Sequence, residues 1–243
     1  MKVNVHFSPL HSDELYFTAK TTVVIDVLRA TTTVLAALHN GAKEVIPVNS
    51  VEFAMKVSVN SFGGQTLLGG ERNTKKIEGF QLGNSPLEYS KEAVSGKSII
   101  LFTTNGSKAI VKAKFSETLL LCSFLNVKSV AAYLANLNKD IEILCAGKTG
   151  SFCIEDTICA GRLITELKNL KGEELELTDS SKASVILDNA YGNDLQKVLS
   201  ECEHGKLLIE NGFQEDVNYC AQVSVMDLLP SFNNGTVKPL KIP

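Results

Sequence analysis

The stretch that decides the fold class is Thr22–Ala42, which reads TVVIDVLRATTTVLAALHNGA. Its first part, Thr22–Leu28, is rich in β-branched residues and largely apolar on both alternating faces, as a strand buried inside a parallel sheet is. The polar turn RATTT follows, and then an apolar segment with helical spacing that Asn40-Gly41 closes. The sequence therefore predicts a strand, a turn and a helix in succession, which is the building unit of an α/β fold.

The same unit recurs along much of the chain. Strand segments are predicted at 44–48 and 66–70, at the start of 98–113, at 118–124 and at the start of 141–150. Most are followed by a small or polar turn and a helical segment. Continuous apolar runs that alternate with helices predict an α/β fold with a mostly parallel or mixed sheet and helices on both faces.

The C-terminal part has a different pattern. After about Lys171 the sequence predicts short helices joined by polar turns, and segment 219–232, YCAQVSVMDLLPSF, predicts a late strand before a loose tail. No Gly-, Ser- or Pro-rich linker interrupts the chain. We therefore expect a single domain over residues 1–243, with two similar lobes of about 1–120 and 121–243 as the alternative.

Composition and charge argue against several classes of function. The 243 residues are 44% hydrophobic and 21% charged, with a formal net charge of −3 spread along the chain. No basic stripe indicates nucleic acid, and no polybasic tail or long apolar run indicates a membrane. The opening MKVNVHFSPL lacks the apolar core of a signal peptide. We expect a cytoplasmic protein without nucleic-acid or membrane partners, and a homodimer as the common default.

The cysteines and histidines argue against a disulfide framework and against a zinc site. Among six cysteines and four histidines, no CxxC, HxH or HExxH pattern occurs. The cysteines lie mostly in apolar segments of a chain long enough to build a core, so buried free thiols are expected. A metal held by carboxylates stays open.

Asp26 is the first candidate site residue, because ligands of α/β sheets bind at the carboxyl ends of the strands. It lies inside an apolar strand segment, where a carboxylate is costly unless it is paired or binds a metal. A buried ion pair with Arg29 or another base is the alternative. We favour a functional carboxylate, because ionisable groups at strand ends cluster in sites.

Three turns that follow predicted strands offer the parts of an anion site. RATTTV (29–34) supplies Arg29, the hydroxyls of Thr31, Thr32 and Thr33, and a helix N-terminus; TTNG (103–106) supplies Thr104, Asn105 and Gly106; CAGKTG (145–150) supplies Lys148. Backbone N–H groups, the helix dipole and a guanidinium fork all suit phosphate. Each turn has a plain alternative, a threonine cap or a simple tight turn. The third turn also lacks the GxxxxGK[ST] spacing of a nucleotide-binding loop.

Acidic residues beside these turns indicate a divalent cation. Glu155 and Asp156 stand near a predicted helix start, where acids commonly just complement the dipole, but their oxygens also suit Mg²⁺. Glu71, Arg72 and Asn73 directly follow the strand LLGG, in the irregular stretch ERNTKKIEGFQLGNSP (71–86). Ordered loops at strand ends tend to carry substrate contacts, and a solvated connector is the alternative.

Two further residues are weighed as catalytic groups. Cys145 stands at a strand end, as a nucleophile would, but no histidine neighbours it in sequence and a buried structural thiol is favoured. His204, in ECEHGK, is a candidate general acid. A histidine before glycine is more often the C-terminal residue of a helix, which is the favoured interpretation.

Taken together, VVIDVLRATTT, GERN…GFQLGNSP, TTNGSKA and CAGKTGSFCIEDTICAG, in this order, resemble the 2-phosphosulfolactate phosphatase family of the coenzyme M pathway. The segment HGKLLIENGFQEDVNYCAQVSVMDLLP resembles that family's C-terminal part, so the match runs from about Val23 to Pro230. The resemblance implies an α/β topology particular to the family and unlike that of haloacid-dehalogenase phosphatases. In agreement with this contrast, no DxD follows the first strand, since Val27 and Leu28 come after Asp26.

The resemblance also implies a Mg²⁺-dependent acid phosphatase that hydrolyses (R)-2-phospho-3-sulfolactate to (R)-3-sulfolactate and phosphate. On this hypothesis Asp26, Glu71 and Asp156 hold the metal directly or through water, and Arg29 completes the catalytic set. Arg29, the hydroxyls of Thr31–Thr33 and the Thr104–Gly106 turn then bind the phosphate. Arg72 and Asn73 bind the sulfonate or carboxylate, and Lys148 adds a further cation.

The sequence leaves the mechanism and two rival functions open. Direct attack by water and a phospho-enzyme are both compatible with these residues, and Asp26 is the nucleophile candidate in the second case. One rival function is a phosphatase for another small phosphorylated 2-hydroxy acid, because a fold does not fix a substrate. The other is a non-catalytic anion-binding module, against which the acids at strand ends count, because they repel a bare phosphate.

Overall fold

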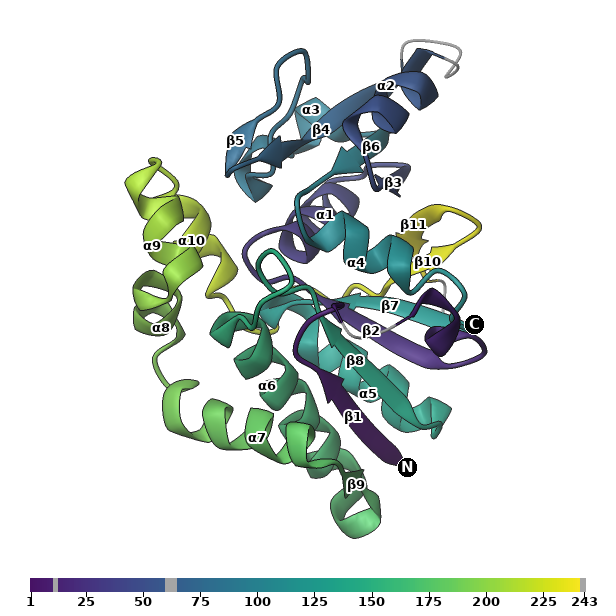
Figure 1. The fold of residues 1–243 in the computed structure, drawn as a ribbon, viewed down its shortest axis with the longest axis vertical. Helices are drawn as coiled ribbons and strands as arrows, with labels where there is room; N and C mark the ends of the chain where they lie inside the picture. Colours follow the sequence, from purple (N-terminus) through teal and green to yellow (C-terminus); the bar gives the residue numbers. More distant parts are fainter. Residues whose placement is uncertain (11–12, 60–64, 241–243) are drawn as a thin grey trace.

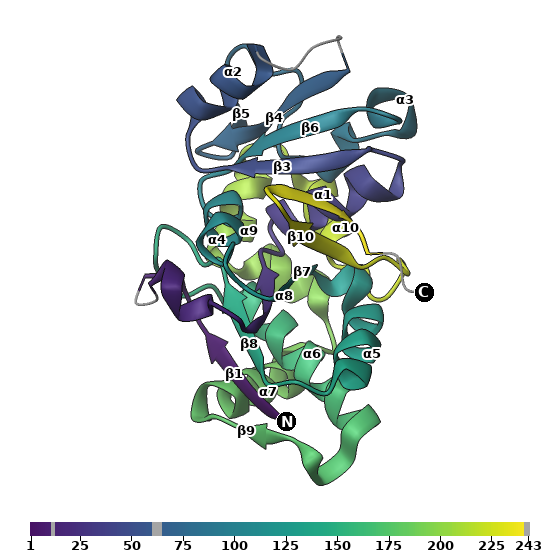
Figure 2. The same cartoon turned by 90° about the vertical axis from the view of Figure 1, so that its right-hand side faces the viewer.

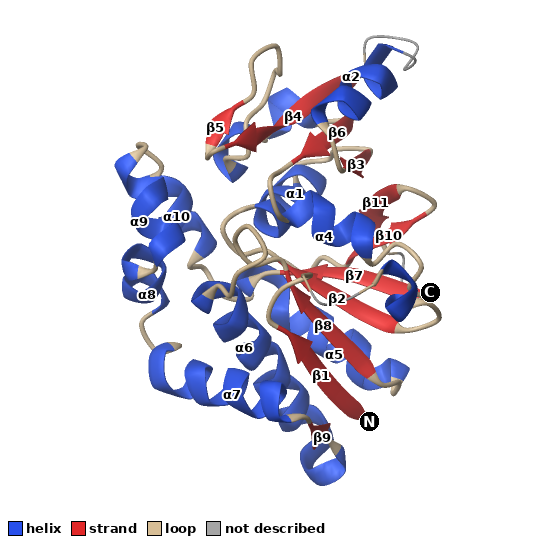
Figure 3. Cartoon of the chain, viewed as in Figure 1, coloured by secondary structure: helices blue, strands red, loops and turns tan. Residues whose placement is uncertain are grey.

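The computed structural model describes residues 1–10, 13–59 and 65–240, and within them eleven strands form one sheet (Figures 1 and 3). The strand order is β5-β4-β6-β3-β11-β10-β7-β2-β8-β1-β9. The strands are β1 (Lys2–His6), β2 (Thr21–Ile25), β3 (Glu44–Val48), β4 (Thr66–Arg72), β5 (Lys75–Lys76), β6 (Ser98–Phe102), β7 (Thr118–Cys122), β8 (Ile141–Cys145), β9 (Glu176–Leu177), β10 (Pro230–Asn233) and β11 (Thr236–Pro239).

Helices cover both faces of this sheet. They are α1 (Ala30–His39), α2 (Val51–Val59), α3 (Lys91–Val94), α4 (Gly106–Lys112), α5 (Val127–Leu137), α6 (Ile154–Lys171), α7 (Asp179–Tyr191), α8 (Leu195–Glu201), α9 (Glu203–Glu210) and α10 (Gln214–Cys220), with short 3₁₀ turns η1 (Glu14–Phe17), η2 (Pro86–Glu88), η3 (Phe124–Asn126) and η4 (Gly172–Glu174). In the described part of the chain, no helix combines the length and the apolarity that crossing a membrane requires.

The central strand β2 explains why the opening stretch is apolar on both faces. It pairs in parallel with β7 on one side and β8 on the other. Val23 and Ile25 pack with α5 and α6, whereas Val24 packs with α1 and α4. Full burial of such a side chain contributes about 1.5–3 kcal/mol, so both faces of β2 stabilise the fold.

Two parallel sections make up most of the sheet, and an antiparallel hairpin joins them. One section contains β4, β6 and β3, and the other contains β7, β2, β8, β1 and β9. The hairpin β10–β11 lies between them, with Ser231 beside Leu120 and Val237 beside Val45. Figure 2 shows this hairpin, in yellow, between β3 and β7.

The α/β class with a mostly parallel sheet and helices on both faces is confirmed. The strand predicted over Thr22–Leu28 ends earlier, at Ile25, because the chain turns towards α1 directly after it. The prediction of a loose tail is wrong, because the chain returns after β10 and pairs with β3 as β11. The division into one domain or two lobes stays a prediction. One of the four histidines, His11, lies outside the described residues.

Candidate active site

A small pocket lies where the carboxyl ends of β2, β4, β6 and β8 come together, and its volume is about 90 Å³. Seven of the site residues predicted from the sequence line it: Asp26, Arg29, Glu71, Asn73, Thr104, Asn105 and Lys148. Leu28, Thr74, Asn84, Thr103, Thr149, His204 and Leu207, which the sequence did not assign to the site, complete the lining. Because these strands come from both parallel sections, the pocket occupies the junction at which α/β sheets bind ligands.

Asp26 stands directly after β2, just before α1. Its Oδ1 accepts the N–H of Ala30 at 3.1 Å, and its own N–H donates to Thr31 Oγ1 at 3.1 Å. Burial raises the pKa of Asp26 to about 6, and the positive charge of His204 opposes the shift. A carboxyl group with this pKa changes its charge close to neutral pH, which suits nucleophilic or acid–base chemistry.

The other oxygen of Asp26 faces Gly106, the first residue of α4. A Cβ atom at Gly106 would lie 2.4 Å from Asp26 Oδ2 and 2.4 Å from Ala30 Cβ. Any side chain there would displace Asp26, so glycine is what lets α4 approach the carboxylate. Gly106 does not line the pocket, and its contact with phosphate stays a prediction.

Glu71, near the end of β4, connects two loops beside the pocket. Its Oε2 accepts the N–H of Thr74 at 3.0 Å, and its Oε1 accepts the N–H of Thr104 at 2.7 Å. These bonds fix the turn after β4 to the turn after β6. Arg72 and Asn73 follow Glu71 and are exposed; Asn73 lines the pocket and Arg72 does not.

Arg29 is almost fully buried and is held by a helix from the C-terminal part of the chain. Its Nη1 donates to Asp216 Oδ2 at 2.6 Å, its Nη2 donates to Thr74 O at 2.9 Å, and its guanidinium carbon lies 4.3 Å from the centre of the Phe213 ring. Asp216 also accepts the Ser85 hydroxyl at 2.6 Å. Arg29 therefore pairs with Asp216 and not with Asp26. A guanidinium has about five N–H donors, so this arrangement leaves donors for a ligand.

Lys148 lies in a tight turn after β8. Lys148 and Ser151 exchange backbone hydrogen bonds of 3.0 and 2.9 Å, and Gly147 has φ +62°. A Cβ atom at Gly147 would lie 2.2 Å from Ser151 O, so the turn requires glycine there. The Thr149 N–H donates to Asn105 Oδ1 at 2.9 Å, which ties this turn to the one after β6.

Three oxygen atoms of residues that line the pocket have no hydrogen-bond partner among the described residues. They are Thr74 Oγ1, Asn84 Oδ1 and Thr104 Oγ1. Buried polar atoms are normally paired, and each unpaired one costs about 1–3 kcal/mol. The convergence of three such atoms on one pocket indicates that a ligand or ordered water completes them.

The threonines of α1 lie behind the pocket and do not line it. The hydroxyls of Thr31, Thr32 and Thr33 donate to the backbone oxygens of Asp26, Val27 and Asn84, at 2.8, 3.0 and 2.8 Å. All three side chains are fully buried. They therefore fix the loops that carry Asp26 and Asn84, and their contact with phosphate stays a prediction.

Asp156, in the first turn of α6, also lies behind the pocket. Its Oδ1 accepts the N–H of Val27 at 2.9 Å, and its Oδ2 accepts the N–H of Gly147 at 3.1 Å. Burial raises the pKa of Asp156 well above its usual value, and the negative charges of Asp26 and Glu155 add to the shift. Asp156 thus ties the loops after β2 and β8 together.

Glu155 precedes Asp156 but behaves differently. Burial raises the pKa of Glu155, but the contact with His204 and the charge of that histidine outweigh burial, so the pKa lies below its usual value. Two adjacent buried acids of α6 therefore favour opposite charge states, because among the described residues only Glu155 has a basic neighbour. Cys145, the nucleophile considered from the sequence, is fully buried, and burial raises the pKa of its thiol.

The pocket lining fits a hard cation held by oxygen atoms. Asp26 and Glu71 supply carboxylates, and Asn84 and Thr104 supply unpaired oxygens. Proteins commonly hold Mg²⁺ by one or two carboxylates together with substrate phosphate and water. Within the described ranges, no group of three His, Cys, Asp or Glu side chains gathers as metal ligands. The donors thus fit a two-carboxylate site, and a third ligand from Asp156 stays a prediction.

A larger hollow of about 810 Å³ lies among α6, α7, α8 and α10 but offers less to an anion. Its Arg162 Nε donates to both carboxylate oxygens of Asp188, at 3.0 and 3.1 Å, and its Nη2 donates to Gly192 O at 2.8 Å. The guanidinium is therefore neutralised in place. The smaller pocket is the better candidate for the site.

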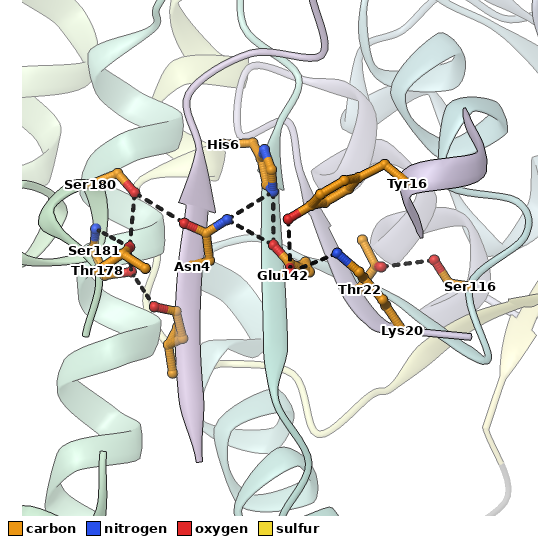
Figure 4. Close-up of polar contacts among 11 residues, drawn as sticks. Asn4, His6, Tyr16, Lys20, Thr22, Ser116, Glu142, Thr178, Ser180 and Ser181 are labelled. Atoms are coloured by element: carbon orange, nitrogen blue, oxygen red, sulfur yellow. Dashed lines mark hydrogen bonds and ion pairs between the residues drawn. The ribbon is translucent and has the colours of Figure 1, made fainter. Parts of the chain in front are cut away.

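A second group of polar and charged side chains lies on β1, β8, η1 and the turn before β2 (Figure 4). Glu142 Oε2 accepts from Asn4 Nδ2 and His6 Nε2, each at 2.8 Å, and Oε1 accepts from the Tyr16 hydroxyl and Lys20 Nζ, each at 3.1 Å. We call these five residues the Glu142 cluster. Burial raises the pKa of Glu142, but the hydrogen bonds outweigh burial and hold the pKa at about 2.

Comparisons with known proteins bear on the chemistry of this pocket. The family model of 2-phosphosulpholactate phosphatase matches residues 8–235. A protein of Caldanaerobacter subterraneus, named probable 2-phosphosulfolactate phosphatase, is 46% identical over 219 residues, which cover 90% of each chain. Proteins with the same name are 40% identical in Clostridium perfringens strain SM101, over 99% of this chain and 97% of the relative, and 38% identical in Clostridium acetobutylicum, over 98% and 100%.

Proposed function

This chain belongs to the 2-phosphosulpholactate phosphatase family, and from that premise we propose that it hydrolyses (R)-2-phospho-3-sulfolactate to (R)-3-sulfolactate and phosphate with the aid of Mg²⁺. As a member of this family the chain is a phosphoric monoester hydrolase. The substrate and the metal are the parts of the proposal that the following observations support.

One observation carries the proposal: the pocket at the strand ends combines carboxylates, cations and unpaired oxygens. Asp26 and Glu71 lie in the same lining as Lys148 and Arg29. The substrate carries about four negative charges at neutral pH, from one phosphate, one sulfonate and one carboxylate. It therefore needs several separate positive or N–H-rich contacts, which this lining supplies.

Mg²⁺ would resolve the electrostatic conflict in this pocket. Two carboxylates repel a bare phosphate unless a cation intervenes. Asp26 and Glu71, with Asn84 and Thr104, would hold the ion. When bound, the ion would neutralise charge on the phosphoryl oxygens.

The remaining residues take the substrate. Arg29 is fixed by Asp216 with donors to spare, and we assign it to the phosphoryl group. Lys148 lies in the turn after β8, which the hydrogen bond from Thr149 to Asn105 connects to the turn after β6, and it adds a further cation for the substrate. Arg72 and Asn73, exposed at the rim, are the proposed contacts for the sulfonate or the carboxylate.

Asp26 is the central catalytic group of the proposal. Its Oδ2 faces the N-terminus of α4, and its pKa of about 6 provides a carboxylate for neutral conditions. It acts either as the nucleophile of a phospho-enzyme or as the base that takes a proton from water. The stereochemistry at phosphorus distinguishes these, because a phospho-enzyme involves two in-line displacements and gives net retention with a chirally labelled phosphoryl group, whereas direct attack by water gives inversion.

A substrate panel tests the proposed function. Phosphate release is measured from 2-phosphosulfolactate, 2-phospholactate and 3-phosphoglycerate, in EDTA and after Mg²⁺ is restored. We expect the sulfonated substrate to have the highest kcat/KM and EDTA to abolish turnover. Preference for another phosphorylated 2-hydroxy acid would replace the substrate. Binding of phosphate without turnover of any monoester would instead indicate a non-catalytic anion-binding protein.

The setting of the reaction belongs to the same proposal. We place the protein in the cytoplasm, in a route to coenzyme M or another use of sulfolactate, and expect a homodimer as the default. Light scattering of the purified protein measures the mass in solution, and a monomer there would contradict the dimer.

A further inference from the structure

His204 lies in the same pocket as the residues proposed for catalysis. It is the second residue of α9, a helix from the C-terminal part of the chain, and it lines the pocket opposite the strand ends. The sequence favoured a histidine at a helix C-terminus, and this interpretation is wrong, because the helix starts at Glu203. His204 thus comes to the pocket from an element that contributes no other charged residue to the lining.

Glu155 contacts the Nδ1 atom of the His204 ring. The distance from His204 Nδ1 to Glu155 Oε1 is 3.6 Å, and the side chains are 16% and 3% exposed. This is an ion pair slightly longer than a hydrogen bond, and such contacts commonly shorten when substrate binds. His204 lines the pocket, whereas Glu155, which contacts its ring, does not.

The buried carboxylate needs this histidine. A buried charge without a partner is very costly, and among the described residues His204 is the only basic side chain within 4.0 Å of Glu155. With Nδ1 directed at Glu155, the ring's other nitrogen, Nε2, is the one left for the pocket. A carboxylate that fixes the tautomer and orientation of a histidine is the usual support of a proton-transferring imidazole.

We propose that His204 is the general acid of the reaction, which donates the Nε2 proton to the leaving-group oxygen, and that Glu155 is the residue that positions it. This inference rests on the proposed function. The other donors in the described lining are poorer acids: Arg29 is bound to Asp216, the hydroxyl of Thr104 is a weak acid, and an ammonium group, which Lys148 carries, is ordinarily a weaker acid than an imidazolium.

The step balances in atoms and charge. A bond forms from phosphorus to the attacking oxygen, of water or of Asp26, while the bond from phosphorus to the oxygen on carbon 2 breaks. The electron pair of the broken bond stays on that oxygen, which takes the Nε2 proton and leaves as the hydroxyl of sulfolactate. An attacking water gives its proton to Asp26. If Asp26 itself attacks, a water then attacks the phosphorus of the aspartyl phosphate, frees the carboxylate and gives its proton to solvent. The imidazole is left neutral with its Nδ1 proton towards Glu155, and solvent restores the Nε2 proton.

Leaving-group dependence tests the proposal most directly. An alkyl phosphate requires a proton on its leaving oxygen, whereas p-nitrophenolate leaves without one. For His204→Gln we expect kcat on 2-phosphosulfolactate to fall by about 10²–10⁴-fold and kcat on p-nitrophenyl phosphate by less than about 10-fold. His39→Gln, at an exposed histidine outside the pocket, is the matched control and should leave both rates unchanged.

Glu155→Gln provides a second, independent variant. It keeps the shape of the side chain but removes the charge that positions the imidazole, so kcat on the alkyl substrate should fall by about 10–100-fold and kcat on the aryl substrate by less than about 3-fold. Glu203→Gln, an exposed acid next to His204, is its control. Affinity for inorganic phosphate, measured by calorimetry, should stay within about 3-fold in every variant, because proton donation does not bind the product.

The outcomes separate this inference from the proposed function. Equal losses on both substrates, or no loss, in His204→Gln overturn the role of His204 while the enzyme remains a phosphatase. Should that variant fail to fold, Glu155→Gln decides by the same comparison, the loss of kcat on 2-phosphosulfolactate against the loss of kcat on p-nitrophenyl phosphate. A wild-type protein that releases phosphate from no monoester overturns the proposed function, and this inference with it.

Discussion

The Glu142 cluster and the pocket around Asp26 are both built from buried or half-buried charges, yet they are opposite in character. Glu142 accepts four hydrogen bonds from side chains, and its pKa is held at about 2. Burial raises the pKa of Asp26 to about 6, and three unpaired oxygens line the pocket beside it. A carboxylate that accepts all its hydrogen bonds from the protein stabilises the fold. A carboxylate beside unpaired polar atoms is available to bind a ligand or to react.

The largest expected effect falls on catalysis at Asp26. Asp26→Asn keeps the size of the side chain and its contact with Ala30 but removes the carboxylate, so we expect phosphate release to fall by about 10³-fold or more. The measurement is steady-state kcat with Mg²⁺ in excess. Turnover close to that of the wild type would show that Asp26 is no more functional than Glu142.

The second effect concerns the buried ion pair that holds Arg29 beside the pocket. Asp216→Ala leaves the buried Arg29 without its partner, and loss of one member of such a pair costs about 3–5 kcal/mol in the free energy of unfolding. Urea unfolding measures the loss, with the fully exposed Asp179→Ala as control. A change below about 1 kcal/mol would mean that Arg29 finds water or another acceptor when Asp216 is removed.

The third effect falls on the Glu142 cluster. For Glu142→Gln we expect a loss of about 1–3 kcal/mol in the free energy of unfolding at pH 7, with kcat within about two-fold of the wild type. Because the pKa of Glu142 is lowered in the fold, this contribution is present above the unfolded value of about 4.5 and is lost as pH falls towards about 2. The difference in the free energy of unfolding between the wild type and Glu142→Gln should therefore be smaller near pH 3 than at pH 7. A strong loss of kcat in the variant would contradict a purely structural role of the cluster.

The fourth effect has the opposite dependence on pH. The pKa of Asp26 is raised in the fold, so folding favours its protonated form, and that advantage is lost as pH rises from about 4 to about 6. In EDTA, Asp26→Asn should thus be more stable than the wild type by about 1–3 kcal/mol at pH 7.5 and about equal to it near pH 4. Parallel curves for Asp26→Asn and Glu142→Gln would remove the contrast between the two regions.

The smallest effect probes the unpaired oxygens. Thr104→Val removes a hydroxyl that has no partner among the described residues, so we expect the free energy of unfolding to stay within about 0.5 kcal/mol or to rise. The KM for the substrate should rise by about 3–10-fold, because the Thr104 hydroxyl would no longer help to hold the Mg²⁺ that binds the phosphoryl group. Thr22→Val is the control, because its hydroxyl is already bonded to Ser116 and its loss should cost stability without affecting KM.

The sequence predicted the fold class and the edge of the sheet where the pocket lies, because both follow from local patterns. The apolar run of β2 and the recurrence of strand, turn and helix identify a parallel sheet, and polar residues after the strands then share one edge. Thr74 and Asn84 could have been found in the same way, since both lie in the irregular stretch 71–86 already noted.

What the sequence could not predict depends on contacts between distant segments. Asp216 and His204 reach the site from short C-terminal helices, and no local spacing shows that they face Arg29 and Glu155. Asp156 stood out as an acid near a turn, but only the coordinates show that its oxygens are occupied by backbone N–H groups. An unpaired oxygen is likewise invisible until its neighbours are known.

The hairpin β10–β11 has a consequence for how the chain folds during its synthesis. It connects β3 with β7, and it leaves the ribosome after every other strand of the described sheet. A nascent chain can pair the strands of each parallel section by itself, but the sheet becomes continuous between the two sections only once these last strands are added. Fragments that stop shortly before Pro230 should therefore lack the strands that connect the two parallel sections and should be catalytically inactive.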